Sequence, residues 1–220
     1  MHTTSHQLYY FWEKIIKKKK IPIIWFICNE YRGMPEKLKF AKEMGISMLV
    51  SQSLSKSIHL MYQKNLNIKV IGLPTVGFEN DFFFAGKSSK YRKIDIGYRG
   101  ASSPPWLGHW EREEISSVFQ DKASNVLTVD ISIDMQKRLK RKNWAKFLRD
   151  CKTQLSTSSG CDYFELTDKT RYKVENYIAK NQNYKRTDIE KLLPPKKGRI
   201  KCRILSARIF EAASSKTAQI

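Results

Sequence analysis

The sequence lacks the features that mark several large classes of protein. It has only four cysteines in 220 residues, with no Cys-x-x-Cys pair and no histidine nearby at metal-ligand spacing, which argues against a disulfide framework. No apolar run approaches the roughly 20 residues that cross a bilayer, and residues 1–6 do not resemble the start of a signal peptide. A soluble, cytoplasmic protein is therefore expected.

Three common catalytic motifs are also missing. The sequence contains no G-x-x-x-x-G-K-[ST], no G-x-S-x-G and no H-E-x-x-H. Their absence argues against an ATPase, a serine hydrolase and a zinc protease.

What the chain does have is a large excess of positive charge. It holds 41 lysines and arginines against 21 acidic residues, which gives a net charge of +20. Such an excess suits nucleic acid, an anionic membrane face or an anionic substrate such as a sugar nucleotide. Many lysines alternate with acidic residues on amphipathic stretches such as 36–43, so solvated helix faces account for most of the charge.

Short apolar runs rich in β-branched residues alternate with helical patterns along the chain. This alternation predicts an α/β fold with parallel strands joined by crossovers. We expect a linker at 85–93, because residues 79–93 show no period, and two Rossmann-like domains at 1–84 and 94–220. Residues 217–220 look like the start of a further strand, so we expect both domains to be incomplete. The expected strands are 21–28, 46–50, 70–73, 94–98, 126–131 and 200–205, with a further strand-like piece around 154–155. The expected helices are 35–44, 54–64, 111–119, 135–151, 170–180 and 187–193, with another opening near 207.

Polar clusters follow several of these strands, where parallel sheets bind their ligands. They are residues 29–33, 51–53, 97–100 and 156–160. Each cluster is also ordinary turn chemistry, since Asn, Gly and Ser favour turns. Arg99 is the most informative, because a guanidinium beside Gly97 and Gly100 can bind a phosphate that the backbone approaches closely.

Five segments, taken in order, resemble motifs of group 1 glycosyltransferases, in the branch of spore-maturation-type and polysaccharide-locus enzymes. The resemblance spans roughly residues 20 to 220. The segments are 26–32 (FICNEYR), 73–78 (LPTVGF), 94–100 with 106–108 (IDIGYRG and WLG), 144–148 through 160 (WAKFL to G), and 206–213 (SARIFEAA).

The resemblance implies the GT-B architecture and transfer of a sugar from a nucleotide sugar to a cell-surface polysaccharide or glycan acceptor. The second domain would bind the donor and the first the acceptor. Such enzymes use no cofactor and usually no metal, because basic groups and helix N-termini stabilise the departing nucleoside diphosphate.

The resemblance also implies site residues. Arg99 would contact the diphosphate, Glu211 the ribose or donor sugar, and Glu30 would do acceptor or base work. The full set expected to bind the donor is Gly97, Arg99, Gly100, Ser158, Gly160, Arg208 and Glu211.

Three positions depart from the family's pattern. Ser158 replaces a glutamate, Asn29 replaces an aspartate, and an acidic stretch replaces an expected lysine, for which Arg112 is the candidate substitute. Loss of one positioned group costs on the order of a hundredfold in rate, so we expect a weak or inactive enzyme.

Two alternatives stay open. One is a basic α/β module that binds nucleic acid or an anionic membrane, for which the best feature is the aromatic run 9–12 followed by lysines 17–20. The other is a catalytically inactive partner of a transferase. Nucleic acid is the less expected partner, and the anionic inner membrane face is a candidate for peripheral contact.

Overall fold

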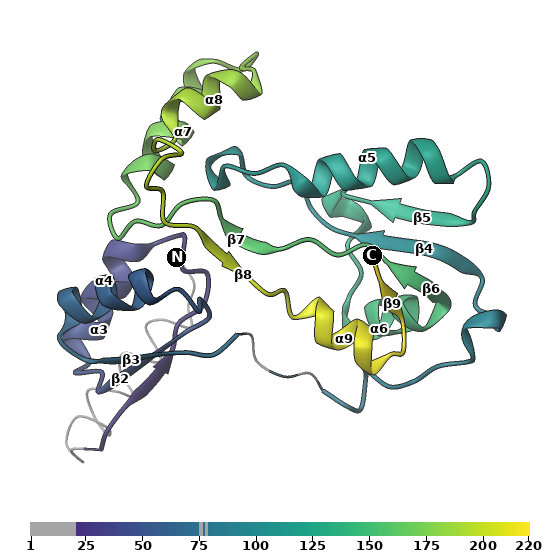
Figure 1. Ribbon diagram of the computed structural model, residues 1–220, viewed down its shortest axis with the longest axis horizontal. Coiled ribbons are helices and arrows are strands. Elements are labelled where there is room, and N and C mark those ends of the chain that lie inside the picture. The colour runs from purple at the N-terminus through teal and green to yellow at the C-terminus, as the bar shows by residue number, and fades with distance from the viewer. Residues whose placement is uncertain (1–20, 75–76, 78) are drawn as a thin grey trace.

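The computed structural model describes residues 21–74, 77 and 79–220. These residues form two parallel sheets flanked by helices, together with one antiparallel ribbon (Figure 1). The predicted α/β class with parallel strands is therefore confirmed. The aromatic and lysine runs at 9–12 and 17–20 lie outside the described residues.

The first sheet has the order β1-β2-β3, with all strands parallel. Two crossover helices, α3 and α4, connect its strands, as the alternating pattern predicts. The elements are β1 (Ile24–Phe26), α3 (Met34–Glu43), β2 (Met48–Ser51), α4 (Lys56–Leu66) and β3 (Lys69–Gly72).

The second sheet has the order β5-β4-β6-β9 and is also parallel. The chain leaves β4 towards β5 and then returns past it to β6, so helices α5 and α6 lie on opposite faces (Figure 1). Loops at the carboxyl ends of β4 and β6 thus diverge, which is where open α/β sheets form a crevice. The elements are β4 (Ile94–Arg99), α5 (Glu111–Ala123), β5 (Val129–Ser132), α6 (Arg141–Asp150), β6 (Cys151–Gln154) and β9 (Ala218–Gln219).

A long excursion separates β6 from β9. It begins with β7 (Ser159–Cys161), continues through α7 (Lys169–Lys180) and α8 (Arg186–Leu192), and returns along β8 (Cys202–Ile204). The strands β7 and β8 pair with each other in antiparallel fashion. The expectation of parallel pairing is therefore wrong for the strand predicted at 200–205. Helix α9 (Arg208–Ser214) then leads into β9.

The helix expected at 135–151 is two elements. A short 3-10 turn, η4 (Met135–Lys137), is capped by the Asp134 carboxylate, which accepts a hydrogen bond from the Gln136 amide at 2.8 Å. Lys140 has extended backbone, with φ −71° and ψ 161°, so the α-helix begins only after it. Two further 3-10 turns lie at η2 (Ser89–Tyr91) and η3 (Pro105–Leu107).

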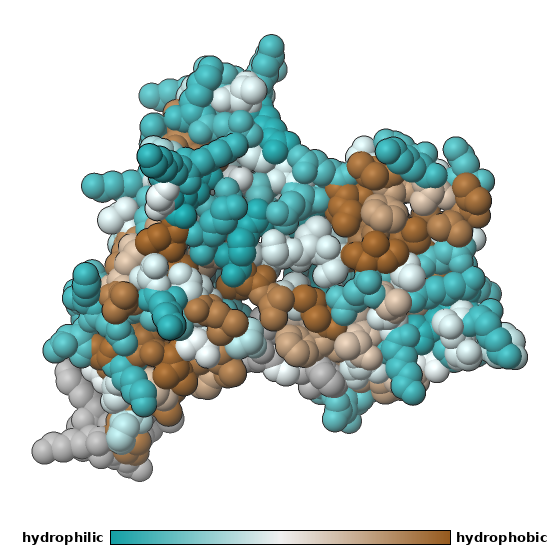
Figure 2. Space-filling view, in the orientation of Figure 1, coloured by the Kyte–Doolittle hydropathy of each residue, from teal (hydrophilic) through white to brown (hydrophobic). Residues whose placement is uncertain are grey.

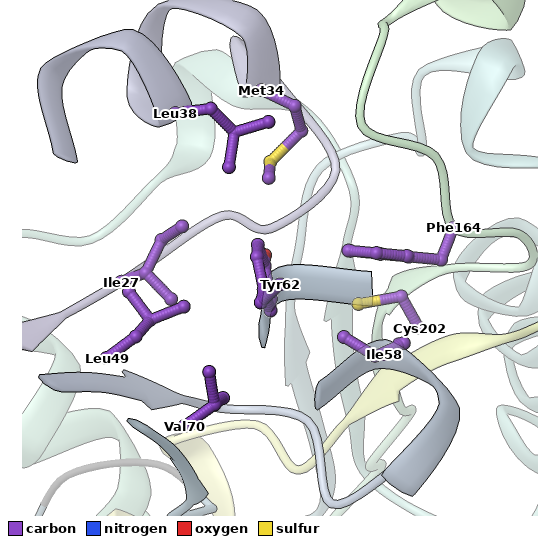
Figure 3. Close-up of a cluster of buried hydrophobic side chains, with 9 residues drawn as sticks. All are labelled: Ile27, Met34, Leu38, Leu49, Ile58, Tyr62, Val70, Phe164 and Cys202. Atoms are coloured by element: carbon purple, nitrogen blue, oxygen red, sulfur yellow. The ribbon is translucent and has the colours of Figure 1, made fainter. Parts of the chain in front are cut away.

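The excursion packs on the first sheet. Phe164 and Cys202 share a buried cluster with Ile27, which follows β1, and with residues of α3, β2, α4 and β3 (Figure 3). The Tyr62 and Phe164 rings meet edge to face at 5.4 Å. The buried Asp168 carboxylate accepts hydrogen bonds from the amides of Gly33 at 2.7 Å and Met34 at 3.0 Å. Part of the expected second domain thus completes the core of the first sheet.

The surface of the molecule is largely hydrophilic over α7 and α8, with apolar residues gathered near α5 and β5 and around the first sheet (Figure 2). None of the helices in the described parts of the chain combines the length and the apolar character that a membrane crossing requires.

Candidate functional site

A cavity of about 440 Å³ opens at the carboxyl ends of β4 and β6. Tyr98 and Gly100 line it from β4 and the loop that follows, and Leu155 and Ser156 line it from the loop after β6. Its remaining walls come from the segments that begin α5, α6 and α9. The cavity therefore lies where the strand order of this sheet reverses, which is the usual ligand site of such sheets.

Two aromatic rings form part of the lining. Tyr98 is almost fully buried, and Trp144 stacks on Phe147 with ring centroids 5.8 Å apart. The Arg208 guanidinium lies 5.1 Å from the Trp144 ring and 6.0 Å from the Tyr98 ring. The Trp144 Nε1 donates a hydrogen bond to Oε2 of Glu211 at 2.7 Å. Both Arg208 and Glu211 are thus held in place by aromatic side chains.

The cavity is strongly cationic. Its lining includes five arginines and a single carboxylate, that of Glu211. Arg141 is paired with Glu79 and Arg99 with Asp130, while Arg112, Arg138 and Arg208 complete the set.

The charge around Arg208 is only partly compensated. Burial lowers the pKa of the Arg208 guanidinium, Tyr98 and Glu211 raise it, and the positive charges of Arg112 and Arg138 lower it further. Cations that repel one another in a half-buried place gain when an anion enters, because the anion favours the charged form of each. Phosphate and carboxylate groups are the ligands that arginine binds best in this way.

The Arg99 side chain is held by Asp130 of the neighbouring strand. Its guanidinium donates to the Asp130 carbonyl at 2.9 Å and to Oδ1 of Asp130 at 2.6 Å, and it lies 4.4 Å from the Phe147 ring. The side chain is only 14% exposed. Arg99 also lines the cavity and accepts a hydrogen bond from Arg208 at its backbone carbonyl. Its side-chain charge is therefore already largely neutralised by Asp130.

The expected glycines have separate roles. Gly97 is not among the cavity residues, and a Cβ there would lie 2.3 Å from Sγ of Cys151, so it allows close packing. Gly100 lines the cavity against the Tyr98 ring. Gly160 has φ +95° and sits in the ribbon, where a Cβ would lie 1.9 Å from the Cys202 carbonyl oxygen.

Ser158 and Glu30 also lie outside the cavity. Ser158 donates to Glu111 at 3.1 Å and accepts from Arg203 at 2.9 Å. Glu30 is fully buried at the end of the first sheet, where its carboxylate accepts hydrogen bonds from the Ser51 hydroxyl at 2.7 Å and the Tyr62 hydroxyl at 2.9 Å. The Gln52 amide donates to it at 2.6 Å. Glu30 therefore stabilises the loop that begins at the end of β2.

The structure thus brings Arg99, Gly100, Arg208 and Glu211 to one cavity, together with residues that the sequence did not single out as ligand contacts. Trp144 lies in a segment that carries the family resemblance, so the sequence held a signal that could have placed it at the site. Arg138 lies in a basic run that reads as solvated helix surface. Nothing in the sequence indicated its position.

Within the described residues, no three histidine, cysteine or acidic side chains are grouped as a metal site. Comparison with models of protein families, with curated proteins and with solved structures gave no match to this chain. The resemblance to group 1 glycosyltransferases therefore stays a prediction.

Proposed function

We propose that this chain binds the diphosphate of a nucleotide sugar in the cationic cavity and acts as a GT-B glycosyltransferase. The observation that carries the proposal is the convergence of Arg112, Arg138 and Arg208 on one cavity at the switch point of a parallel sheet. Such crevices bind nucleotides in many α/β proteins, and arginine is well matched to phosphate oxygens. The order of the five family-like segments supports the same assignment.

The proposed chemistry is electrostatic. When a glycosidic bond to the diphosphate breaks, negative charge develops on the departing oxygen, and fixed guanidinium groups stabilise it without reorganising. Arg208 is the best placed, because its guanidinium is held near the Trp144 and Tyr98 rings. Glu211 would accept a hydrogen bond from a hydroxyl of the ribose or donor sugar. The acceptor in this proposal is a cell-surface polysaccharide or glycan.

Titration calorimetry with UDP, GDP and their sugar conjugates tests the proposal. We expect Arg208→Ala to weaken diphosphate binding by at least about tenfold, as for loss of a charged hydrogen-bond partner. Arg186→Ala is the matched control, since Arg186 is half exposed and paired with Glu114 and Glu190 outside this cavity. Equal affinity of the two variants, or no binding of any nucleoside diphosphate, would reject the proposal.

A catalytically silent donor-binding protein is the second candidate. It is favoured by one observation, namely that Glu30, expected to do acceptor or base work, and Glu211, expected to bind the donor, already accept hydrogen bonds from protein groups. Glu30 accepts several hydrogen bonds in a fully buried place, and Glu211 accepts one from Trp144. Binding of a nucleotide sugar with neither transfer nor slow hydrolysis of the donor would favour this candidate over the enzyme.

A further inference from the structure

Two cysteines lie opposite each other in the backbone register of the β7–β8 ribbon. Cys161 and Cys202 are direct partners in its antiparallel register. Side chains of directly opposite residues on antiparallel strands project from the same face, with Cα atoms about 4.5 to 5.5 Å apart. A disulfide requires Cα atoms about 4.4 to 6.8 Å apart. The register therefore places the two Cα atoms at a separation that a disulfide can span.

Both thiols are fully buried, and both are free. The two thiols pack in different buried clusters. The Cys161 thiol donates a hydrogen bond to the Leu107 carbonyl at 3.3 Å and packs beside Leu107, whereas Cys202 packs with Tyr62 and Phe164 (Figure 3). Burial raises the pKa of Cys161 to about 12, and it raises the pKa of Cys202 as well. Each is thus a neutral thiol in the closed ribbon, and joining them requires a side-chain rotation that gives up the Leu107 contact.

We propose that Cys161 and Cys202 are a disulfide-forming pair that is oxidised by a low-molecular-weight disulfide such as oxidised glutathione. One cysteine thiolate attacks oxidised glutathione, forms a mixed disulfide and releases one glutathione thiolate. The second cysteine thiolate then attacks the protein sulfur of the mixed disulfide and releases the other glutathione. The two cysteines lose two electrons to the glutathione disulfide, and their two protons go to the released glutathiones.

The bridge would link the two strands of the ribbon from which the excursion extends. The ribbon carries the whole excursion, residues 162–201, which packs on the first sheet. Ser156 and Thr157 lie shortly before β7, and Ser206 lies shortly after β8. All three residues line the cationic cavity. The bridge therefore sets the spacing of two cavity walls. Its formation does not depend on the proposed function.

Burial of the two thiols also limits the rate of their oxidation. Because an external disulfide must reach a sulfur atom, the ribbon has to open before exchange begins. We expect oxidation to be slow in the native protein and efficient when the reduced chain refolds in a glutathione redox buffer. The bridge closes a loop of about 40 residues, so the oxidised form should unfold about 5 to 10 °C higher than the reduced form.

The test uses the full chain with Cys28→Ser and Cys151→Ala, which leaves only the ribbon pair. After refolding with oxidised and reduced glutathione, we expect no free thiol, one cross-linked peptide pair containing Cys161 and Cys202, and the higher unfolding temperature. The matched control adds Cys202→Ser, and it should show neither the cross-link nor the shift.

Several outcomes would overturn the proposal. These are two free thiols in the folded variant, two glutathione adducts in place of a bridge, or a bridge that lowers the unfolding temperature. If the doubly substituted chain does not fold, peptide mapping of the oxidised natural sequence decides. A dominant Cys161–Cys202 peptide supports the proposal, and pairs formed mainly by Cys28 or Cys151 contradict it.

Discussion

The Arg208 guanidinium, at the start of α9, donates a hydrogen bond to the Arg99 carbonyl at the end of β4, 109 residues away in sequence. This contact holds α9 over the carboxyl end of the second sheet. The cationic cavity therefore exists only because the chain returns to this sheet after its excursion to the first.

Arg138 should contribute to anion binding although it is exposed. It lines the cavity, and its charge helps to lower the pKa of Arg208. We expect Arg138→Ala to weaken binding of a nucleoside diphosphate by about 3- to 10-fold, less than Arg208→Ala, and to reduce its salt dependence. Titrations at two ionic strengths measure this, with Arg186→Ala as control. An Arg138→Ala protein that binds as tightly as the natural one would place this arginine outside the ligand's reach.

Glu30→Gln should lower the stability of the folded protein. Its carboxylate accepts hydrogen bonds from Ser51, Gln52 and Tyr62, and an amide nitrogen in its place would face donors with a donor. We expect a loss of about 2 to 4 kcal/mol in the free energy of unfolding, measured by urea denaturation, with diphosphate binding unchanged in the folded protein. Exposed Glu36→Gln is the control, with a change below about 0.5 kcal/mol. Full stability combined with lost transfer would instead assign Glu30 to catalysis.

Gly97→Ala should strain the packing between β4 and α6. The added methyl would lie 2.3 Å from the Cys151 sulfur and 2.9 Å from the Phe147 ring. We expect destabilisation of about 1 to 3 kcal/mol by denaturation. Combining it with Cys151→Ala, which removes the sulfur, should cost less than the sum of the single changes. Strict additivity in this cycle would show that the backbone moves away from the sulfur freely.

Asp168→Asn should loosen the excursion from the first sheet. The Asp168 carboxylate is 1% exposed and binds the Gly33 and Met34 amides as well as the Arg171 guanidinium at 2.9 Å. Its loss should cost about 2 to 4 kcal/mol and speed hydrogen exchange at the start of α3. Asp188→Asn, at the more exposed start of α8, is the control and should cost about 1 kcal/mol or less. Equal effects of the two variants would contradict this role of Asp168.

His109 should make stability depend on pH. Burial lowers its pKa below the ordinary value of 6.5, although its contact with the Gly160 carbonyl partly opposes this. The unfolded chain therefore binds a proton more readily than the folded one between the lowered pKa and 6.5. The contribution of neutral His109 is fully present above pH 6.5 and is lost as the pH falls through this window. Urea denaturation of the natural protein and of His109→Gln should show a flatter dependence for the variant, and parallel curves would contradict the assignment.

Local sequence patterns predicted much of this fold. Helices expected at 35–44 and 54–64 begin and end within about two residues of α3 and α4, because their apolar spacing is a local signal. The ribbon pairing was not predictable in the same way. Each of its strands has three residues, too few to show a period, and their pairing joins residues about 40 positions apart.

The cavity was predictable only in part. Arg208 and Glu211 were expected only because the segment 206–213 resembles a motif of group 1 glycosyltransferases. The orientation of Arg99 depends on Asp130 of the neighbouring strand, and that neighbour is fixed by sheet order and register. The sequence of β4 alone carries no information on the sheet order or on the register.

The shared core of the first sheet also constrains the order of events during synthesis. Ile27, just after β1, and Leu49 of β2 emerge from the ribosome well before Phe164 and Cys202, which share their buried cluster. Until those residues arrive, the first sheet exposes apolar surface that its own helices do not cover. Burial of the first sheet must therefore wait until Cys202 has been synthesised, and contacts of such long range slow its closure.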